Sequence, residues 1–259
     1  METKEKSGFY IWKEMAAYTG VSFATKRHSH FYHQFCFSLD KPFLLKGKNG
    51  KDFYSQAALV PSGVSHETTF GNDRFIILLI DPLLFAVSFH TGFIHKEGDP
   101  AFDLKDIVSN SDILFLETEL KSNQSEAKNK ILQLLKDKFI LENQRNIDNR
   151  IKESLSFIQQ DELDQLTLKQ ISKITKLSPS RFRHLFRSET GITFSSYKLW
   201  KKMQKAIFIL IEQKDLMNAA YEGGFFDQPH FNRVLRRSFG LSPSELKKNP
   251  HFELKIFSS

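Results

Sequence analysis

Two different spacings of apolar residues divide this chain into two regions. Up to about Ile80, apolar and aromatic residues come in short runs separated by turn residues, which is typical of β-strands. Beyond residue 110 they recur at intervals of three and four, which is the spacing of amphipathic helices. Strands followed by helices predict an α+β multidomain protein.

The strand-rich region carries a regular series of short candidate strands. Turn residues separate them at 40–42, 47–50, 61–63 and 71–73. The candidate strands are residues 9–12, 21–25, 31–39, 43–45, 53–60 and 75–80. Several short strands at this spacing predict a small antiparallel β-sandwich or barrel, which together with later helices would form a first domain over 1–142.

Two helices are predicted at the end of this first domain, over 112–120 and 126–141, after an unclear stretch over 82–100. The second carries an apolar stripe that includes Ala127, Ile131, Leu134 and Leu135. Such a stripe could pack on its own β-domain or pair with a second subunit, so a homodimer is one of two alternatives. The polar segment that follows predicts a linker over 143–149.

The second region, 150–259, begins with a predicted helix over 150–160 and then repeats one pattern twice. Residues 166–191 and 215–240 each read as a short helix, a tight turn and a second helix, with a long helix over 194–213 between them. Cap residues punctuate both copies. They are Thr167 with Gln170, Ser178 before Pro179, Gly191, Asp227, Gly240, and a further capping box at 242–245. The repetition predicts an all-α tandem helix-turn-helix domain.

The second helix of each copy has one apolar face and one basic or polar face when its residues are placed at 100° steps. Phe182 and Phe186 mark the buried face of the first helix, and Phe231 and Leu235 that of the second. Arg can form paired hydrogen bonds with guanine, and Asn with adenine, in the major groove of DNA. The candidate DNA-binding residues are Ser180, Arg181, Arg183, His184, Arg187, Gln228, His230, Asn232, Arg233, Arg236 and Arg237.

Charge and length agree with this interpretation. The net charge of the chain is +7, yet residues 1–149 hold 18 Lys and Arg against 19 Asp and Glu, whereas 150–259 hold 19 against 11. The positive excess therefore lies in the region predicted to face phosphates. The 20 residues of the connecting helix rise about 30 Å, close to the roughly 34 Å of one duplex turn. One chain could then read two successive major grooves of double-stranded DNA.

At these residues the chain resembles the AraC/XylS family of transcription regulators. The runs that carry the resemblance are SPSRF (178–182), FRSETG (186–191), Ala206, GFFDQPHF (224–231) and FGLSPSE (239–245). The resemblance implies a cytoplasmic regulator, usually an activator, that has RNA polymerase as a partner.

Three residues depart from the family pattern. Lys202 stands where the family usually has Arg, Gly223 replaces an apolar residue, and Pro229 replaces Ser. Gly223 beside Gly224 is expected to loosen the second unit, and Pro229 removes a hydroxyl from its DNA-facing side. The first unit is therefore expected to carry more of the sequence discrimination.

The first domain contains a group of histidines with a recognisable arrangement. His28 and His30 share one strand face with Gln34 and Cys36 by period-two alternation, and residues 61–66 read P-x-G-x-x-H, ending in His66. Together they resemble the two halves of a cupin motif, whose metal-binding members hold a divalent ion. Gln34 stands where metal cupins usually have Glu.

We favour an effector pocket lined by His28, His30, Gln34 and His66, with no cofactor expected. If a metal is present, His28, His30 and His66 are its candidate ligands. The alternative function is a metal-dependent cupin enzyme with an accessory DNA-binding domain.

Other classes of protein find no support in the sequence. The single cysteine, Cys36, excludes disulfides and cysteine-based zinc sites, which is typical of a reducing compartment. The longest apolar stretch, 75–89, is interrupted by Asp81 and Pro82 and is too short to span a bilayer, so no membrane partner is expected. The sequence also lacks nucleophile-elbow, phosphate-loop and zinc-protease motifs. We therefore expect a regulator that is not an enzyme.

Overall fold

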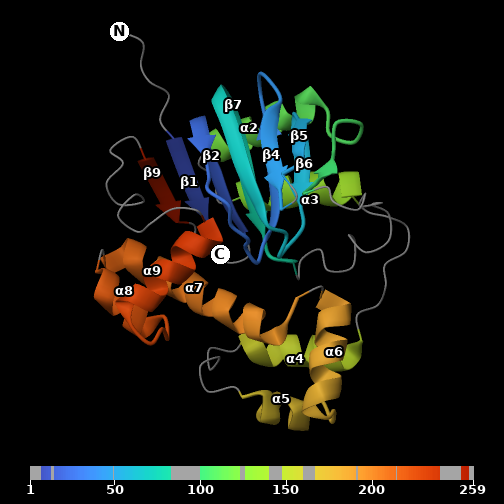
Figure 1. The fold of residues 1–259 in the computed structure, drawn as a ribbon, viewed down its shortest axis with the longest axis vertical. Coiled ribbons are helices and arrows are strands. Elements are labelled where there is room, and N and C mark those ends of the chain that lie inside the picture. The colour runs from blue at the N-terminus through green and yellow to red at the C-terminus, as the bar shows by residue number, and fades with distance from the viewer. Residues whose placement is uncertain are drawn as a thin grey trace.

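The computed structural model describes residues 7–12, 15–48, 50–82, 100–122, 126–139, 148–159, 167–190, 192–213, 215–239 and 252–256. A β-sheet backed by two helices occupies one part of the molecule, and the helices of the second region lie beneath it in Figure 1. The α+β architecture predicted from the sequence is confirmed. Gly191, Gly240, the capping box at 242–245, most of the linker and residues 83–99 lie outside the described residues.

The strands follow the predicted series in order but differ from it in several bounds. They are β1 (Ser7–Ile11), β2 (Met15–Ala24), β3 (His33–Ser38), β4 (Phe43–Gly47), β5 (Asp52–Ser55), β6 (Ala57–Val60), β7 (His66–Ile80), β8 (Phe102–Asp103) and β9 (Phe252–Ile256). The candidate strand at 53–60 is two strands, and β7 begins nine residues earlier than the expected residue 75. Strand β2 begins six residues before the expected residue 21, and β8 and β9 were not predicted.

The strands form one hydrogen-bonded sheet in the order β8-β6-β3-β7-β2-β1-β9, with β4 pairing with β5 and β7. Strand β7 organises this sheet because its first half pairs with β4 and its second half with β3, while β2 runs antiparallel along most of its length. The β-part of the first region is therefore a single sheet that divides around one long strand.

The predicted turn at 71–73 is wrong. Strand β7 continues through Gly71, Asn72 and Asp73, and the register with β2 shifts between Val21 and Phe23. Ser22 lies at this shift with a φ of 62°. The Gly-Asn-Asp signal therefore marks a β-bulge, which uses the same residue types as a turn but bends the strand without ending it.

The helices are α2 (Asn110–Lys121), α3 (Ala127–Phe139), α4 (Asn149–Gln159), α5 (Leu168–Ile174), α6 (Pro179–Thr190), α7 (Phe194–Gln213), α8 (Leu216–Glu222) and α9 (Gln228–Phe239). Helices α2 and α3 cover one face of the sheet (Figure 1). The apolar stripe of α3 is buried there, with Ile131 and Leu135 in the core and the Phe139 ring centroid 5.5 Å from that of Phe35. Of the two alternatives for this stripe, packing on its own β-domain is the one observed.

The opposite face of the sheet shares its core with the helical region. Apolar residues such as Phe75 and Ile77 on β7 belong to one continuous cluster with Phe182 on α6, Trp200 on α7 and Phe231 on α9. The two regions are therefore packed together through a common hydrophobic core.

Strand β9 links the second region to the sheet in another way. It pairs in parallel with the edge strand β1, with Ser7 opposite Phe252 and Ile11 opposite Ile256. The sequence predicted no element after Asn249 and included these residues in a domain over 150–259. In the structure, β9 belongs to the sheet of the first region.

Candidate nucleic-acid interface and histidine cluster

The first helix-turn-helix unit consists of α5, a tight turn and α6. Thr167 caps α5 in the predicted capping box: its Oγ1 accepts from the Gln170 amide at 3.2 Å, and Gln170 Oε1 accepts from the Thr167 amide at 2.7 Å. Lys176 turns the chain in the left-handed conformation, with a φ of 54°, and the Leu177 amide then donates to the Ser172 carbonyl. This is the hydrogen-bond pattern of a Schellman helix end.

The second unit, α8 with α9, repeats this geometry. Asp215 caps α8 by accepting from the amides of Met217 and Asn218, at 2.9 and 3.2 Å. Gly224 occupies the left-handed position with a φ of 76°. The Phe225 amide then donates to the Ala220 carbonyl at 2.9 Å, as Leu177 does in the first unit. The two units therefore share one backbone design.

Gly223 has a role that the sequence did not reveal. A Cβ atom at this position would lie 2.5 Å from the Ala206 Cβ on α7 and 2.7 Å from the Ala219 carbonyl oxygen. The missing side chain lets the end of α8 approach α7 closely. The expectation that Gly223 loosens the second unit is therefore wrong, because the glycine permits tight packing.

Lys202 also joins α7 to the second unit. Its Nζ donates a 2.7 Å hydrogen bond to the Gly224 carbonyl oxygen. The departure from Arg at this position thus retains a cationic donor, which supports the turn between α8 and α9.

Helix α6 exposes every residue that the sequence placed on its outer face. The buried Phe182 and Phe186 rings pack edge-to-face on Phe194 of α7, at centroid distances of 5.2 and 5.6 Å. The exposed residues are Ser180, Arg181, Arg183, His184 and Arg187. The structure brings all five to the outer surface of one helix.

Helix α9 exposes its arginines but shields part of its remaining candidates. Arg233, Arg236 and Arg237 are exposed, whereas Gln228, His230 and Asn232 are half-buried. The His230 ring packs against Phe225 at a centroid distance of 5.4 Å. Asn232 was predicted to point outward, yet its Oδ1 is shielded from solvent and has no hydrogen-bond partner. The apolar packing around Phe231 draws this side chain partly inward.

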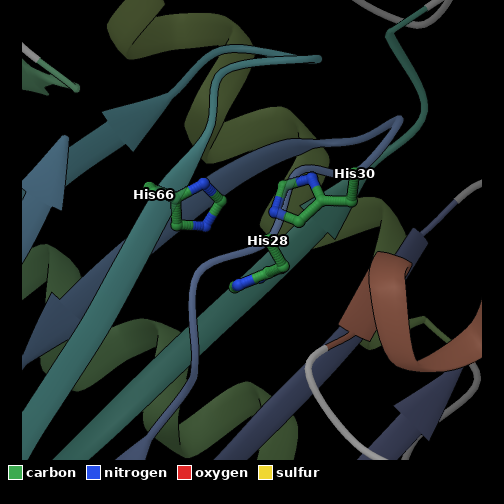
Figure 2. A group of neighbouring side chains, drawn as sticks. All are labelled: His28, His30 and His66. Carbon is green, nitrogen blue, oxygen red and sulfur yellow. The ribbon is translucent and has the colours of Figure 1, made fainter. Parts of the chain in front are cut away.

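Far from these helices, three histidines meet on the face of the sheet that is turned to the helical region. Figure 2 shows the His66 side chain entering from β7, and those of His28 and His30 from the segment before β3. Their ring centroids lie 4.4 Å (His28 to His66), 5.0 Å (His30 to His66) and 5.5 Å (His28 to His30) apart. All three are buried, and one ring nitrogen from each lies within 4.8 Å of the others.

Each imidazole is oriented by a backbone carbonyl. The Nδ1 atoms lie 2.8 Å from the Lys26 oxygen for His28, 3.0 Å from the Tyr32 oxygen for His30, and 2.9 Å from the Val64 oxygen for His66. A carbonyl oxygen can only accept, so in His28 and His66 the Nδ1 carries the hydrogen and the Nε2 keeps its lone pair. The His66 Nε2 is buried without a hydrogen-bond partner.

Gln34 and Cys36 complete the polar group predicted on this strand face. The Gln34 amide contacts His30 Nε2 at 2.8 Å and the Cys36 sulfur at 3.1 Å. Burial raises the pKa of the Cys36 thiol to about 12. Burial also lowers the pKa of His30 to about 4 and the pKa values of His28 and His66, so all three imidazoles are neutral at pH 7.

The contact between the sheet and α7 was not predicted from the sequence. The rings of Phe31 and Tyr32 pack on Trp200, at centroid distances of 5.7 and 3.8 Å. Nearby, Lys201 Nζ lies 3.5 Å from a buried Asp81 carboxylate oxygen. The sequence offered only aromatic residues on both sides, which gave no indication of this pairing.

The two matched units, with their basic outer faces, define a DNA-binding protein of the helix-turn-helix class. The resemblance to the AraC/XylS family of transcription regulators is confirmed by the comparisons with known proteins. A family model described as "Helix-turn-helix domain" matches residues 171–249. In the described part of the chain, no helix has the length and apolar character needed to cross a membrane.

Comparison with known proteins supports the assignment. The probable transcriptional regulator LumQ of Photobacterium leiognathi is 26% identical over 67% of this chain and 71% of its own. The arabinose operon regulatory protein of Escherichia coli is 31% identical over 39% of this chain, but the match spans only 35% of that protein. These relatives are regulators of transcription and not enzymes.

A solved structure shares the whole fold. Unsaturated fatty acid bound ToxT of Vibrio cholerae aligns with 95% of this chain and 96% of its own, with a TM-score of 0.54 and 14% identity. At this identity, the likeness concerns the fold alone.

Proposed function

We propose that this protein is an effector-responsive transcription regulator that reads two adjacent major grooves with α6 and α9. The observation that carries the proposal is that both recognition helices pack on one connecting helix, which itself packs on the sheet. We further propose that residues 1–142 form the sensor, completed by β9, and that the DNA-binding domain begins near residue 150 after a linker at 143–149.

The length of α7 supports the reading of two grooves. It holds 20 residues, which rise about 30 Å and approach the roughly 34 Å repeat of the duplex. The exposed Arg183 on α6 and Arg233 on α9 would then face successive grooves. Arginines pair with guanine edges or with phosphates, so both helices have the chemistry that DNA reading requires.

The sheet-to-α7 contact supports a response to an effector. Trp200 and Lys201 of α7 contact Phe31, Tyr32 and Asp81 of the sheet region. A change of packing beneath Tyr32 would shift α7 and, with it, both recognition helices relative to the sheet. Packed contacts with discrete arrangements transmit such changes better than flexible ones do.

The structural relative supports a small-molecule effector as the input. ToxT, which shares this two-part fold, has been solved with an unsaturated fatty acid bound. We extend the principle of effector binding to this chain and place the effector near His28, His30, Gln34 and His66, on the face of the sheet turned to α7.

The experiment is selection of bound duplexes from a random DNA pool by the full chain, repeated at several salt concentrations. The expected product is two half-sites about one helical turn apart, with affinity that falls steeply as salt rises because phosphate contacts release counterions. Arg183→Ala and Arg233→Ala should each relax one half-site. Recovery of a single half-site, altered by Arg183→Ala but not by Arg233→Ala, would contradict reading by two units.

A further inference from the structure

The histidine cluster has more acceptors than donors. With their Nδ1 atoms directed at carbonyl oxygens, the Nε2 atoms of His28 and His66 present lone pairs. His30 has an acceptor on both sides, because Gln34 Oε1 lies 2.8 Å from its Nε2 and the Tyr32 oxygen lies 3.0 Å from its Nδ1. A neutral imidazole has one N–H and can donate to only one of them.

The His66 Nε2 makes this shortage concrete. It is fully buried and has no hydrogen-bond partner. Leaving a buried acceptor without a hydrogen-bond partner destabilises the folded protein. A carboxylate would not correct the shortage, since it brings further acceptors, and an apolar ligand brings no partner at all. A cation would.

We propose that His28, His30 and His66 bind one divalent late transition-metal ion, such as Zn²⁺ or Ni²⁺, through their Nε2 atoms. Imidazole nitrogen is the ligand type that these ions prefer. Metal-binding histidines commonly donate the other ring N–H to a backbone carbonyl, which fixes the tautomer. The Nδ1 atoms of all three imidazoles already lie within hydrogen-bond distance of a backbone carbonyl oxygen.

The spacing requires only a small adjustment. Zinc-nitrogen bonds of about 2.0–2.1 Å in tetrahedral geometry hold donors about 3.3 Å apart, and here one ring nitrogen from each histidine lies within 4.8 Å of the others. Small side-chain rotations close this difference. The three histidines leave a fourth position for water, for Gln34 or for an exogenous ligand.

The metal would act on the DNA-binding region through His30. This side chain contacts the Tyr32 carbonyl through Nδ1, and the Tyr32 ring packs on Trp200 of α7 at 3.8 Å. Drawing His30 Nε2 away from Gln34 and toward the ion alters this contact. The regulatory part of the inference rests on the proposed function, whereas metal binding itself does not.

The first test measures metal content and coordination. Full-length protein stripped by chelator and dialysed against Zn²⁺ should retain one equivalent, and Co²⁺ should give the visible absorption of an ion bound by nitrogen. His66→Ala and His28→Ala should abolish both signals. His33→Asn is the matched control, because His33 lies outside the cluster and its Nδ1 accepts from the Ser62 amide, an interaction that an Asn oxygen can replace.

Absence of stoichiometric metal in the folded wild-type protein, or equal retention by every variant, would overturn the inference. His28→Ala guards against a folding defect in His66→Ala because it removes a less buried ring. The Co²⁺ spectrum of the wild-type protein tests metal binding without depending on the folding of any variant.

The second test uses the same preparations with the selected DNA. Wild-type affinity should change by about tenfold between the metal-free and the metal-loaded protein, and His66→Ala should not respond. DNA binding without any metal retention would refute the metal site and leave the proposed function standing. Metal retention without specific DNA binding would support the metal site and refute the proposed function.

Discussion

The two helix-turn-helix units have the same backbone but are stabilised differently. In the first, the left-handed turn residue is Lys176, and the residue before it is the buried Thr175, whose hydroxyl donates to the Ile171 carbonyl. In the second, both positions are glycines, and the turn is held by α7 through Ala206 and Lys202. The first unit is thus locally self-sufficient, whereas the second depends on its connecting helix.

The largest expected effect comes from Gly223→Ala. The new methyl would meet the Ala206 Cβ, so we expect a loss of about 3 kcal/mol in unfolding free energy, at the upper end for an overpacked core. Thermal denaturation measures this loss of unfolding free energy. Thr175→Ala, at the matching position of the first unit, should lose only about 1 kcal/mol. Ala206→Gly combined with Gly223→Ala should recover part of the loss, and a double variant no better than the single one would contradict the packing argument.

Next comes the pair Arg183→Ala and Asn232→Ala, which occupy the same position in α6 and α9 counted from the caps Ser178 and Asp227. Arg183 is exposed, so its loss should remove about 1–3 kcal/mol of preference for the selected DNA over random DNA. Asn232 is partly shielded and should lose less than about 1 kcal/mol. Competition binding between selected and random DNA measures the preference that each variant loses. Equal weakening on selected and random DNA by Arg183→Ala would show that it contacts only phosphates.

Lys202→Met should have a smaller effect. Removing the hydrogen bond to Gly224 should lower the unfolding free energy by about 1.5 kcal/mol. Lys205→Met on the same helix is the matched control, because it removes the same charge from an exposed position. Urea denaturation compares the two, and identical midpoints would show that Lys202 does not support the turn.

Pro229→Ser should have the smallest effect. Position 229 matches Ser180 of the first unit, so the new hydroxyl should add one phosphate contact and raise affinity about two- to fivefold. The salt dependence of binding should stay constant, since no charge is added. Titrations at two salt concentrations measure both quantities. A steeper salt dependence would show that α9 changes its seating on DNA.

Local signals in the sequence were sufficient to predict the helix bounds and caps of the helical region. The capping box at Thr167, the N-cap at Asp227 and the bounds of α7 are all visible in short stretches of sequence, and the structure confirms them. Such features depend on neighbouring residues alone.

Contacts between distant residues account for what was missed. The bulge at Gly71 resembles a turn unless the pairing of β7 with β2 is known, and the close approach of Gly223 to Ala206 involves two separate helices. Within the histidine group, the two sequence motifs placed His28 and His30 with His66, and the structure brings the three rings together. The contact of Tyr32 with Trp200 has no local signal at all.

The pairing of β9 with β1 has a consequence for association between molecules. An unpaired edge strand offers a row of amide and carbonyl groups to any other extended chain. Here Phe252 to Ile256 occupy the edge at β1 from Ser7 to Ile11, so that row is already used within the molecule. Strand β9 therefore occupies the β1 edge and becomes the edge strand on this side of the sheet.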